Sequence, residues 1–384
     1  MDAGPLSGFR TTPHKWRPEG CAQVALVLQG GGALGAYQGG VYQALHEAGL
    51  EPDWLDGVSI GSVNAAIIAG NARERRLERL RNFWERITAR PVLPVTPHGD
   101  AARQIYNIWS SLLTTWFGVP DFFTPYFPGP WLTPAGAAGS TSFYDSAPLR
   151  ALLEELVDFD RLNGGEVRYS AGAVEVTTGD FVYFDSAAMT IGPEHVMASG
   201  ALPPALPMIQ VGQGLYWDGG VVSNTPLQHL LDNAGSGNML AFQIDLFSGS
   251  GPVPRDILQV YDRRKDIQYA SRTRTVTEAF LRMRRQDEQM RKLLEKIPES
   301  ALDADQRALK RRLEDQAKVA IVHLTYAESA YEGAAKDYDF STSSMDEHWQ
   351  AGYRDTRAAL AHREWLQMPR GGEGIVVHGT PYGG

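Results

Sequence analysis

The chain has little cysteine and no long apolar run. Its 384 residues include a single cysteine, Cys21, which excludes an intrachain disulfide and argues against a cysteine-based metal site. No stretch approaches the roughly 20 apolar residues that a membrane-spanning helix needs. Residues 1–20 lack the apolar core of a secretory signal, and we expect a loose leader there. These absences favour a cytoplasmic protein whose contact with a membrane, if it has one, is peripheral.

An excess of basic residues is also missing. The sequence has 36 Lys and Arg against 45 Asp and Glu, a formal net charge of −9, which argues against nucleic acid as a partner. The apolar content of 43% suits a globular protein with one large core or two modest ones. No pattern fixes the oligomeric state.

Short apolar runs alternate with helical patterns in the first two thirds of the chain. Residues 24–28 and Trp54–Val58 are typical of buried parallel strands, and helices are expected over 36–48 and from the turn at 57–61 through Ala69. Further strands are predicted at 167–176, 181–184, 214–218 and 239–246. The alternation predicts an α/β fold, a three-layer sandwich around a central, mostly parallel sheet.

The composition changes after "FSGSGPVP", which begins at Phe247. Apolar residues from Val276 to Ile297 repeat at alternating steps of four and three, which predicts a long helix that forms a hairpin with residues 301–317. "VAIVHLTY" is expected to return one strand to the sheet, and residues 345–366 to form a last helix. We therefore predict a first domain over 21–247, a mainly helical extension over 255–370 and a loose tail over 371–384.

Residues 104–132 interrupt the α/β pattern. Nine of these 29 positions are Phe, Tyr or Trp, against 10% in the whole chain. Such an insert suits a lid, an acyl-chain pocket, a membrane-contacting surface or simple packing on the sheet, and the sequence leaves these alternatives open.

The first motif is "VALVLQGGGALGAY", which satisfies G-x-G-x-x-G at Gly30, Gly32 and Gly35. A glycine turn between a strand and a helix exposes backbone N–H groups. Those groups can cradle a dinucleotide pyrophosphate or the oxyanion of an ester under attack.

The second motif, "GVSIGS", places Ser59 between Gly57 and Gly61 at a predicted strand-to-helix turn. Such an elbow exposes the serine hydroxyl and points a helix N-terminus at it. A glycine-rich turn in which the serine only caps the helix would have the same sequence pattern. The third motif, "YWDGGVVSNTPL", places Asp218 at a strand end before Gly219 and Gly220. By itself this is typical of a turn-initiating Asp. Residues 224–226 ("NTP") predict a helix start with a capping side chain.

In this order, the three motifs resemble those of the patatin-like phospholipase family, in particular bacterial members with a C-terminal helical extension. The phrases "VLQGGGALGAYQGGVYQAL", "LDGVSIGSVNAA", "ASGALPPALP" and "GLYWDGGVVSNTPL" carry the resemblance over residues 21–247, which it makes a patatin-like hydrolase domain. It implies Ser59 as nucleophile and Asp218 as general base, with no metal or cofactor. It implies an oxyanion hole at Gly30, Gly31, Gly32 and Ala33, and supporting glycines at 35, 57, 61, 219 and 220 (Gly35, Gly57, Gly61, Gly219, Gly220).

The implied activity is hydrolysis of carboxylic esters of lipids, of the phospholipase A, lysophospholipase or acylglycerol lipase type. Leu34 departs from the family pattern, which often has Arg or Lys there, so we expect the cradle to act through backbone dipoles alone. A Ser–Asp dyad also suits the residues, because His46, His195 and His229 are scattered and none lies in a recognisable catalytic frame.

Two other functions compete with hydrolysis. A dinucleotide site would use an acidic residue about 20 positions after the glycines, near Asp53 or Asp56, but the end of the second strand is taken by the serine turn. A catalytically idle membrane-binding scaffold draws support from the aromatic insert and from residues 263–318, which hold 16 basic and 10 acidic residues. A solvated helical pair with internal ion pairs accounts for the same charges.

Overall fold

The computed structural model describes most of the chain in one sheet-centred fold. The described residues are 16–88, 100–119, 121–235, 237–327, 332, 336–370 and 374–379. Residues 1–15 of the expected leader lie outside this range, as do residues 371–373 and 380–384 of the expected tail.

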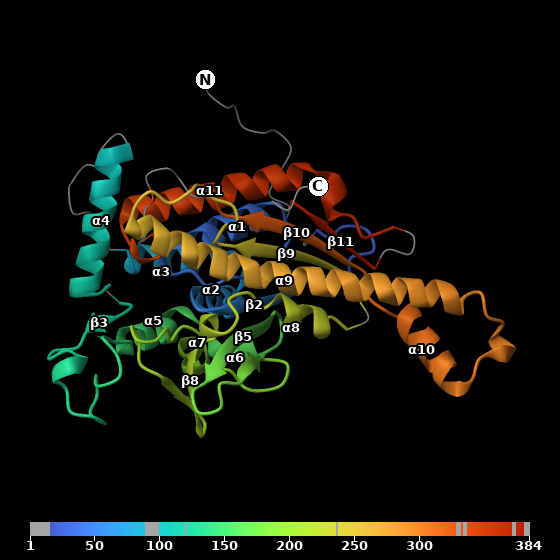
Figure 1. Cartoon of the computed structure of the whole chain (residues 1–384), viewed down its shortest axis with the longest axis horizontal. Helices are drawn as coiled ribbons and strands as arrows, with labels where there is room; N and C mark the ends of the chain where they lie inside the picture. Colours follow the sequence, from blue (N-terminus) through green and yellow to red (C-terminus); the bar gives the residue numbers. More distant parts are fainter. Residues whose placement is uncertain are drawn as a thin grey trace.

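A mixed, mostly parallel sheet forms the centre of the fold (Figure 1). Its order is β11 (Ile375–His378), β10 (Val319–Thr325), β9 (Met239–Asp245), β1 (Gln23–Leu28), β2 (Trp54–Val58), β5 (Arg168–Glu175), β8 (Gly214–Asp218) and β7 (Ile209–Val211), with β6 (Phe181–Asp185) also paired to β5. Every pairing from β11 to β5 is parallel, whereas β6, β7 and β8 are antiparallel. The predicted α/β class is confirmed.

Alternate residues of β1 face two different cores. Leu26 belongs to the larger core, with residues of α1 (Ala36–Glu47), α2 (Ile60–Ala69) and α11 (Thr342–Ala361). Val27 belongs to the smaller core, with residues of α8 (Leu227–Asp232) and α9 (Ile257–Leu294). Successive side chains of a strand point to opposite faces, so helices cover both sides of the sheet and the fold has three layers.

The remaining helices surround this frame. They are α3 (Arg73–Arg86), α4 (Asp100–Phe117), α5 (Ala147–Leu156), α6 (Phe159–Asn163), α7 (Pro193–Ser199) and α10 (Ala304–Glu314). The aromatic insert begins as α4 and continues through the short strand β3 (Thr124–Pro125), which pairs with β4 (Tyr144–Asp145). Figure 1 shows this part at one end of the molecule and the expected α9–α10 hairpin at the other. None of the described helices combines the length and the apolar character of a membrane span.

The C-terminal third is built into the sheet. β10 pairs with β9, as predicted, and α11 packs closely on α1. A methyl group at Gly352 of α11 would lie 2.0 Å from the carbonyl oxygen of Tyr37, so the crossing requires glycine there. The expected loose tail is wrong over Ile375–His378, because the β-branched run at its start pairs with the free edge of β10.

Candidate active site

The register of the sheet brings Ser59 and Asp218 together. β2 ends at Val58, which lies opposite Gly172 of β5. The next residue of β5, Ala173, lies opposite Asp218 on β8. Ser59 follows Val58 directly, so two residues 159 positions apart in the chain meet at the same point along β5.

Ser59 lies at a strained turn between β2 and α2. Its φ of 57° and ψ of −129° fall in a region that L-residues rarely adopt. Its N–H lies 3.1 Å from both the carbonyl oxygen and the Oγ of Ser199, which holds the turn in place. A methyl group at Gly61 would lie 2.2 Å from the Leu28 carbonyl oxygen, and one at Gly57 would lie 2.5 Å from the Gly61 carbonyl oxygen. The elbow therefore needs both flanking glycines.

Asp218 is a buried carboxyl next to this serine. Only 1% of its surface is exposed, and its Oδ1 accepts the Gly220 N–H at 2.7 Å. Burial raises the pKa of Asp218 from its ordinary 3.8 to about 7, against the lowering effect of the neighbouring Ser59 side chain and of the Gly220 N–H. The carboxyl therefore changes charge near neutral pH.

The glycine loop runs past the same serine. A methyl group at Gly30 would lie 2.8 Å from Ser59 Cβ. The Gly30 N–H donates a hydrogen bond to the Asn224 carbonyl oxygen at 3.3 Å. Gly30 therefore differs from the other three residues expected to form an oxyanion hole, because its N–H already has a partner. In the part of the chain that the structure describes, the N–H groups of Gly31, Gly32 and Ala33 make no hydrogen bond. Three free donors thus begin the turn that leads into α1.

The other expected glycines each mark a close approach. A methyl group at Gly35 would lie 2.7 Å from Ile60 Cγ1, and one at Gly219 would lie 2.6 Å from the Gly172 carbonyl oxygen. At Gly220 it would lie 3.0 Å from Asn224 Oδ1.

Leu34 has a core position. Its side chain is fully buried in the larger core.

Asn224 is a site residue that the sequence reasoning missed. It was expected to start a helix with a capping side chain, but α8 begins at Leu227 and its N-cap, Pro226, makes no side-chain cap bond. The Asn224 Nδ2 instead donates to the Gly30 carbonyl oxygen at 2.8 Å. A polar side chain in a tight turn after Asp218 was the available signal, but its partner lies 194 residues away.

A buried polar network around Gln29 holds the glycine loop in place. Gln29 Nε2 donates to Thr225 Oγ1 at 3.0 Å, and Gln29 Oε1 accepts the Leu246 N–H at 2.6 Å. Gln38 Nε2 donates to the Gln29 carbonyl oxygen at 2.6 Å. Together these bonds tie the glycine loop to α1, to the end of β9 and to the segment after Asp218, which fixes the free N–H groups relative to Ser59.

A segment of the C-terminal third reaches the rim of the site. The short 3₁₀ helix η5 (Lys336–Tyr338) lies against the glycine loop, where a methyl group at Gly32 would be 2.3 Å from the Asp337 carbonyl oxygen. Burial of its hydroxyl raises the pKa of Tyr338, and the charges of Asp337 and Asp218 act in the same direction. Tyr338 is 40% exposed.

The histidines lie elsewhere. His229 Nδ1 is 2.8 Å from Asp56 Oδ2, and its ring stacks on Tyr183 at 3.8 Å between centroids. His46 pairs with Glu51, and His195 Nδ1 accepts the Gly192 N–H. No histidine of the described ranges hydrogen-bonds Ser59 or Asp218.

The acids that a dinucleotide site would need are already paired. Asp56 is fully buried against His229, and Asp53 pairs with Arg17 and accepts the Val24 N–H. Among the described residues there is no group of three or more His, Cys, Asp or Glu side chains arranged to hold a metal ion.

The fold and this arrangement define an α/β protein with a serine at a strand–helix elbow, beside a buried acid and a glycine loop. A family model described as patatin-like phospholipase matches residues 26–231, more than half of the chain. A second, described as patatin phospholipase, matches residues 267–371. The chain belongs to the patatin-like phospholipase family.

Curated relatives share parts of this chain. Patatin-like phospholipase domain-containing protein 6 of Homo sapiens is 42% identical over 114 residues, 27% of this chain and 8% of that protein. Lysophospholipase NTE1 of Cryptococcus neoformans is 26% identical over 242 residues, 61% of this chain and 12% of that protein. The chain thus spans only a small part of these longer relatives. The crystal structure of VipD from Legionella pneumophila aligns with 88% of this chain and 67% of its own, at 16% identity and a TM-score of 0.38.

Proposed function

We propose that this protein is a serine lipid acyl hydrolase that acts through a Ser59–Asp218 dyad. The observation that carries the proposal is the place of the Ser59 side chain beside a buried carboxyl, next to three backbone N–H groups that make no hydrogen bond with the described residues. A nucleophile, a base with a pKa near neutrality and preorganised donors are the parts that ester hydrolysis needs.

In the first half of the proposed reaction, Ser59 Oγ attacks the ester carbonyl carbon and its proton passes to the Asp218 carboxylate. The carbonyl oxygen becomes negative and accepts the N–H groups of Gly31, Gly32 and Ala33. The bond to the leaving oxygen then breaks. The leaving alcohol takes the proton from Asp218, and the acyl group stays on Ser59.

In the second half, water attacks the acyl carbon and gives its proton to Asp218. The bond to Ser59 Oγ breaks, and Ser59 recovers the proton. Because one carboxyl serves as base and acid in turn, no histidine and no cofactor enter the scheme. The raised pKa of Asp218 supports this role, since a base with a pKa near the working pH transfers protons in both directions.

The substrate we propose is a carboxylic ester of a lipid. The relatives' names include a phospholipase domain-containing protein and lysophospholipases, and the family is the patatin-like phospholipases. A phospholipid, a lysophospholipid and an acylglycerol all carry the ester that the scheme cleaves.

Covalent labelling with a fluorophosphonate probe tests the nucleophile. Wild type should be labelled once at Ser59, and Ser59→Ala should not be labelled. Ser223→Ala is the matched control, because Ser223 lies near Asp218 without hydrogen-bonding to it. Equal labelling of Ser59→Ala and wild type would contradict the dyad. A lysophospholipid hydrolysis assay on the same variants tests the substrate class.

We also infer that the substrate is met at a lipid surface, through an apolar surface cluster in the insert. Its members are each more than 70% exposed: Trp116, Phe117, Phe127, Trp131 and Leu132. Exposed aromatic residues concentrated in one segment favour the boundary between water and acyl chains.

The insert also packs against the segment that follows η5. Phe122 and Phe123 pack on Phe340, two residues after η5, which lies on the glycine loop. Through Phe340 and η5, the insert is thus connected to the glycine loop.

Co-sedimentation with phosphatidylcholine vesicles tests this surface. Leu132→Ser should reduce vesicle binding several-fold, whereas Leu293→Ser, an exposed leucine of α9 outside the cluster, should not. Equal binding of both variants and wild type would remove the inference without affecting the dyad.

A further inference from the structure

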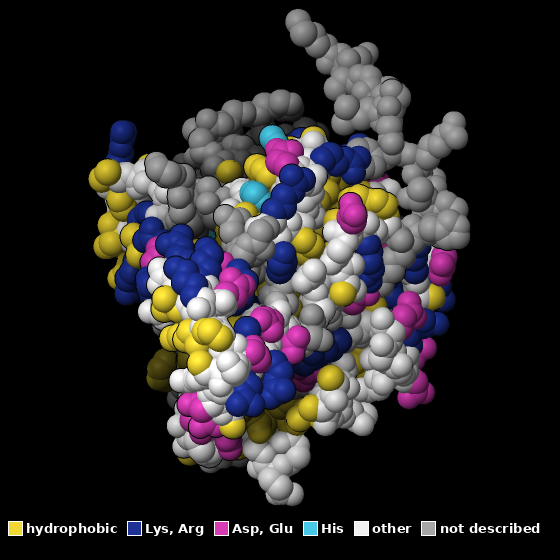
Figure 2. Space-filling view, turned by 90° about the vertical axis from the view of Figure 1, so that its right-hand side faces the viewer, with side chains coloured by type: hydrophobic (Ala, Val, Ile, Leu, Met, Phe, Trp, Pro, Cys, Tyr) yellow, Lys and Arg dark blue, Asp and Glu magenta, His cyan; other side chains and the backbone are white. Residues whose placement is uncertain are grey.

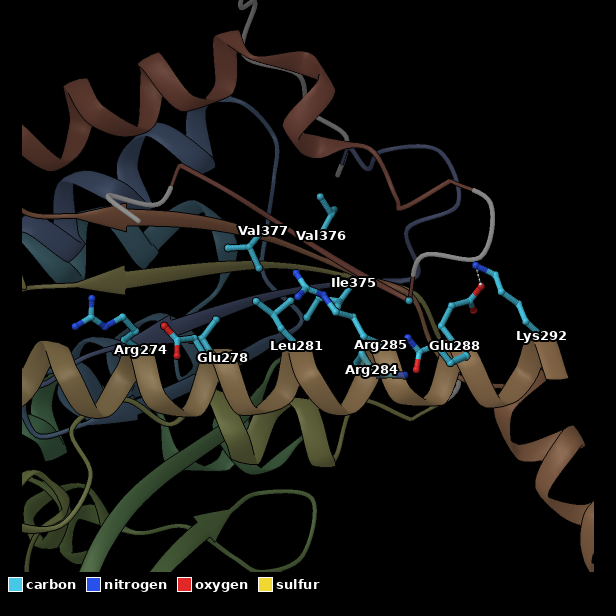
Figure 3. Close-up of a pocket in the computed structure, with 13 residues that line it drawn as sticks. Arg274, Glu278, Leu281, Arg284, Arg285, Glu288, Lys292, Ile375, Val376 and Val377 are labelled. Carbon is cyan, nitrogen blue, oxygen red and sulfur yellow. Dashed lines mark ion pairs between the residues drawn. The ribbon is translucent and has the colours of Figure 1, made fainter. Parts of the chain in front are cut away.

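A cavity lies between α9 and the edge strand β11, outside the candidate active site. It has a volume of about 610 Å³, and none of its lining residues belongs to the Ser59 site. Figure 3 shows Arg284, Arg285 and Glu288 on the α9 side and Ile375 and Val377 across from them on β11.

Arg284 in this groove is a buried cation with unmade hydrogen bonds. It is 6% exposed, and its Nε and Nη1 have no hydrogen-bond partner in the described part of the chain. Burial lowers the pKa of Arg284, and only the charge of Asp287 opposes that effect. Asp287 forms no ion pair with it and accepts a hydrogen bond from Gln316 Nε2 at 2.8 Å. A buried guanidinium without a carboxylate is costly unless a ligand supplies an anion.

The other charges of the groove leave it net positive. Arg274, Arg285 and Lys292 also line it, with Glu278 and Glu288 as the acidic residues. Glu288 already pairs with Arg291 at 2.8 Å and with Lys292 at 3.2 Å. Figure 2, which views the end of the molecule with α10 and the end of α9, shows groups of Lys and Arg with acidic side chains between them. An anion would thus meet an attractive potential here.

The opposite wall of the groove is apolar. Ile375 and Val377 from β11 form this wall, Leu281 of α9 adds an apolar side chain one turn before Arg284, and all three are half-buried. The guanidinium carbon of Arg284 lies 5.0 Å from the centroid of the Phe280 ring, which leaves the cation next to an apolar surface. A ligand that satisfies both walls needs an anionic head and an aliphatic chain.

We propose that this groove binds an anionic amphiphile, an acyl chain that carries one carboxylate or phosphate, with Arg284 as the partner of the head group. A guanidinium presents paired N–H donors that match the two oxygens of such a head, and the aliphatic wall takes the chain. A free fatty acid and a phosphorylated lipid share this chemistry. The site does not depend on the proposed hydrolase activity, because no residue of the dyad or of the glycine loop takes part.

Calorimetric titration of the full chain tests the site, with Ser59→Ala as background to prevent turnover. The probes are decanoate, decyl phosphate and inorganic phosphate. Arg284→Met should weaken the binding of a decyl probe at least tenfold. Arg312→Met, which removes an exposed cation of α10, should leave it unchanged. Slower amide exchange over residues 374–379 on binding would place the probe at β11.

The two decyl probes separate the sources of the head group. Tighter binding of decanoate points to a fatty acid, and tighter binding of decyl phosphate points to a phosphorylated lipid. Inorganic phosphate bound as tightly as decyl phosphate would overturn the acyl-chain assignment, and equal affinities of Arg284→Met and Arg312→Met would overturn the site.

Thermal unfolding separates a ligand-binding role from a structural one. Without probe, Arg284→Met should unfold at or above the temperature of the Ser59→Ala background, because it removes an unpaired buried charge. Decanoate or decyl phosphate should raise the unfolding temperature of the background and of Arg312→Met, but not that of Arg284→Met. A lower unfolding temperature of Arg284→Met, with the same shift on adding probe, would contradict the proposal.

Discussion

Asp56 and Asp218 are both buried at the sheet, yet their surroundings differ. Asp56 lies in β2 beside His229, which is itself flanked by Asp185 at 3.6 Å and by the stacked ring of Tyr183. Asp218 ends β8 beside a serine hydroxyl and one backbone N–H. Burial raises the pKa of both carboxyls.

The contrast separates a structural acid from a candidate catalytic one. The histidine–aspartate pair, which a search for a catalytic triad would select, has only Ser170 as a neighbouring serine, and that residue is fully buried and accepts the Trp54 Nε1–H. The acid without a histidine lies beside Ser59, which is partly exposed at the strand–helix elbow. A raised pKa alone does not identify a base, because the nucleophile next to it decides what the proton can do.

The largest expected effect is the loss of hydrolysis in Asp218→Asn. We expect kcat/KM for p-nitrophenyl esters to fall at least 1,000-fold, of the order seen when a general base is removed. Asp56→Asn is the matched control, since it makes the same change at another buried carboxyl of the sheet. The activity of Asp56→Asn per folded molecule should stay within tenfold of wild type. Equal losses of activity in both variants would contradict the assignment of Asp218, and not Asp56, as the catalytic acid.

The complementary effect is on stability. His229→Phe leaves Asp56 buried without its partner and should lower the free energy of unfolding by about 3–5 kcal/mol. Because His229 touches neither Ser59 nor Asp218, kcat of the folded fraction should not change. Urea unfolding and active-site titration measure the two quantities. A drop in kcat with an unchanged free energy of unfolding would contradict this prediction and indicate that His229 takes part in catalysis.

The pH dependence of hydrolysis should follow Asp218. The base must be ionised to accept the Ser59 proton, and its pKa is about 7. The kcat/KM should therefore rise about tenfold per pH unit below pH 7 and level off above it, a difference of about 100-fold between pH 5 and the plateau. A flat profile between pH 5 and 8 would exclude Asp218 as the base.

Asp218 should also make stability depend on pH. Its folded pKa lies above its unfolded value near 3.8, so the protein binds this proton more tightly when folded. The stability it contributes is fully present below about pH 4 and is lost as the pH rises through about 7. Asp218→Asn should remove this part of the dependence, which unfolding curves at pH 5 and pH 8 would detect.

The smallest expected effect is at Asn224. Asn224→Ala removes the hydrogen bond to the Gly30 carbonyl oxygen and should lower kcat about tenfold, the equivalent of one net hydrogen bond. Ser223→Ala, one residue earlier in the same turn, should stay near wild type. An unchanged kcat in Asn224→Ala would mean that the buried network around Gln29 holds the glycine loop without it.

Local patterns were enough to predict β1, β2, β5, β6, β8, β9 and β10, the α9–α10 hairpin and the three motifs. Strands β1, β2 and β9 are apolar runs bounded by polar or glycine residues, and the spacing along α9 is helical, so each follows from a few neighbouring residues. Asn224 and β11 could not be placed in this way. The partner of Asn224 lies on the glycine loop, and β11 becomes a strand only because the edge of β10 is free.

The sequence by itself determined where the glycine turns, the nucleophile-type serine and the Asp-Gly pair occur, because these depend on backbone conformations that few residues adopt. Only the tertiary structure decided which groups meet. It brought Asp218 to Ser59 through the register of β5, took the Gly30 N–H out of the set of free donors, and buried Arg284 without a hydrogen-bond partner for its Nε and Nη1 among the described residues. The reason is physical: hydrogen-bond partners and burial depend on contacts between distant segments, and a local pattern does not specify them.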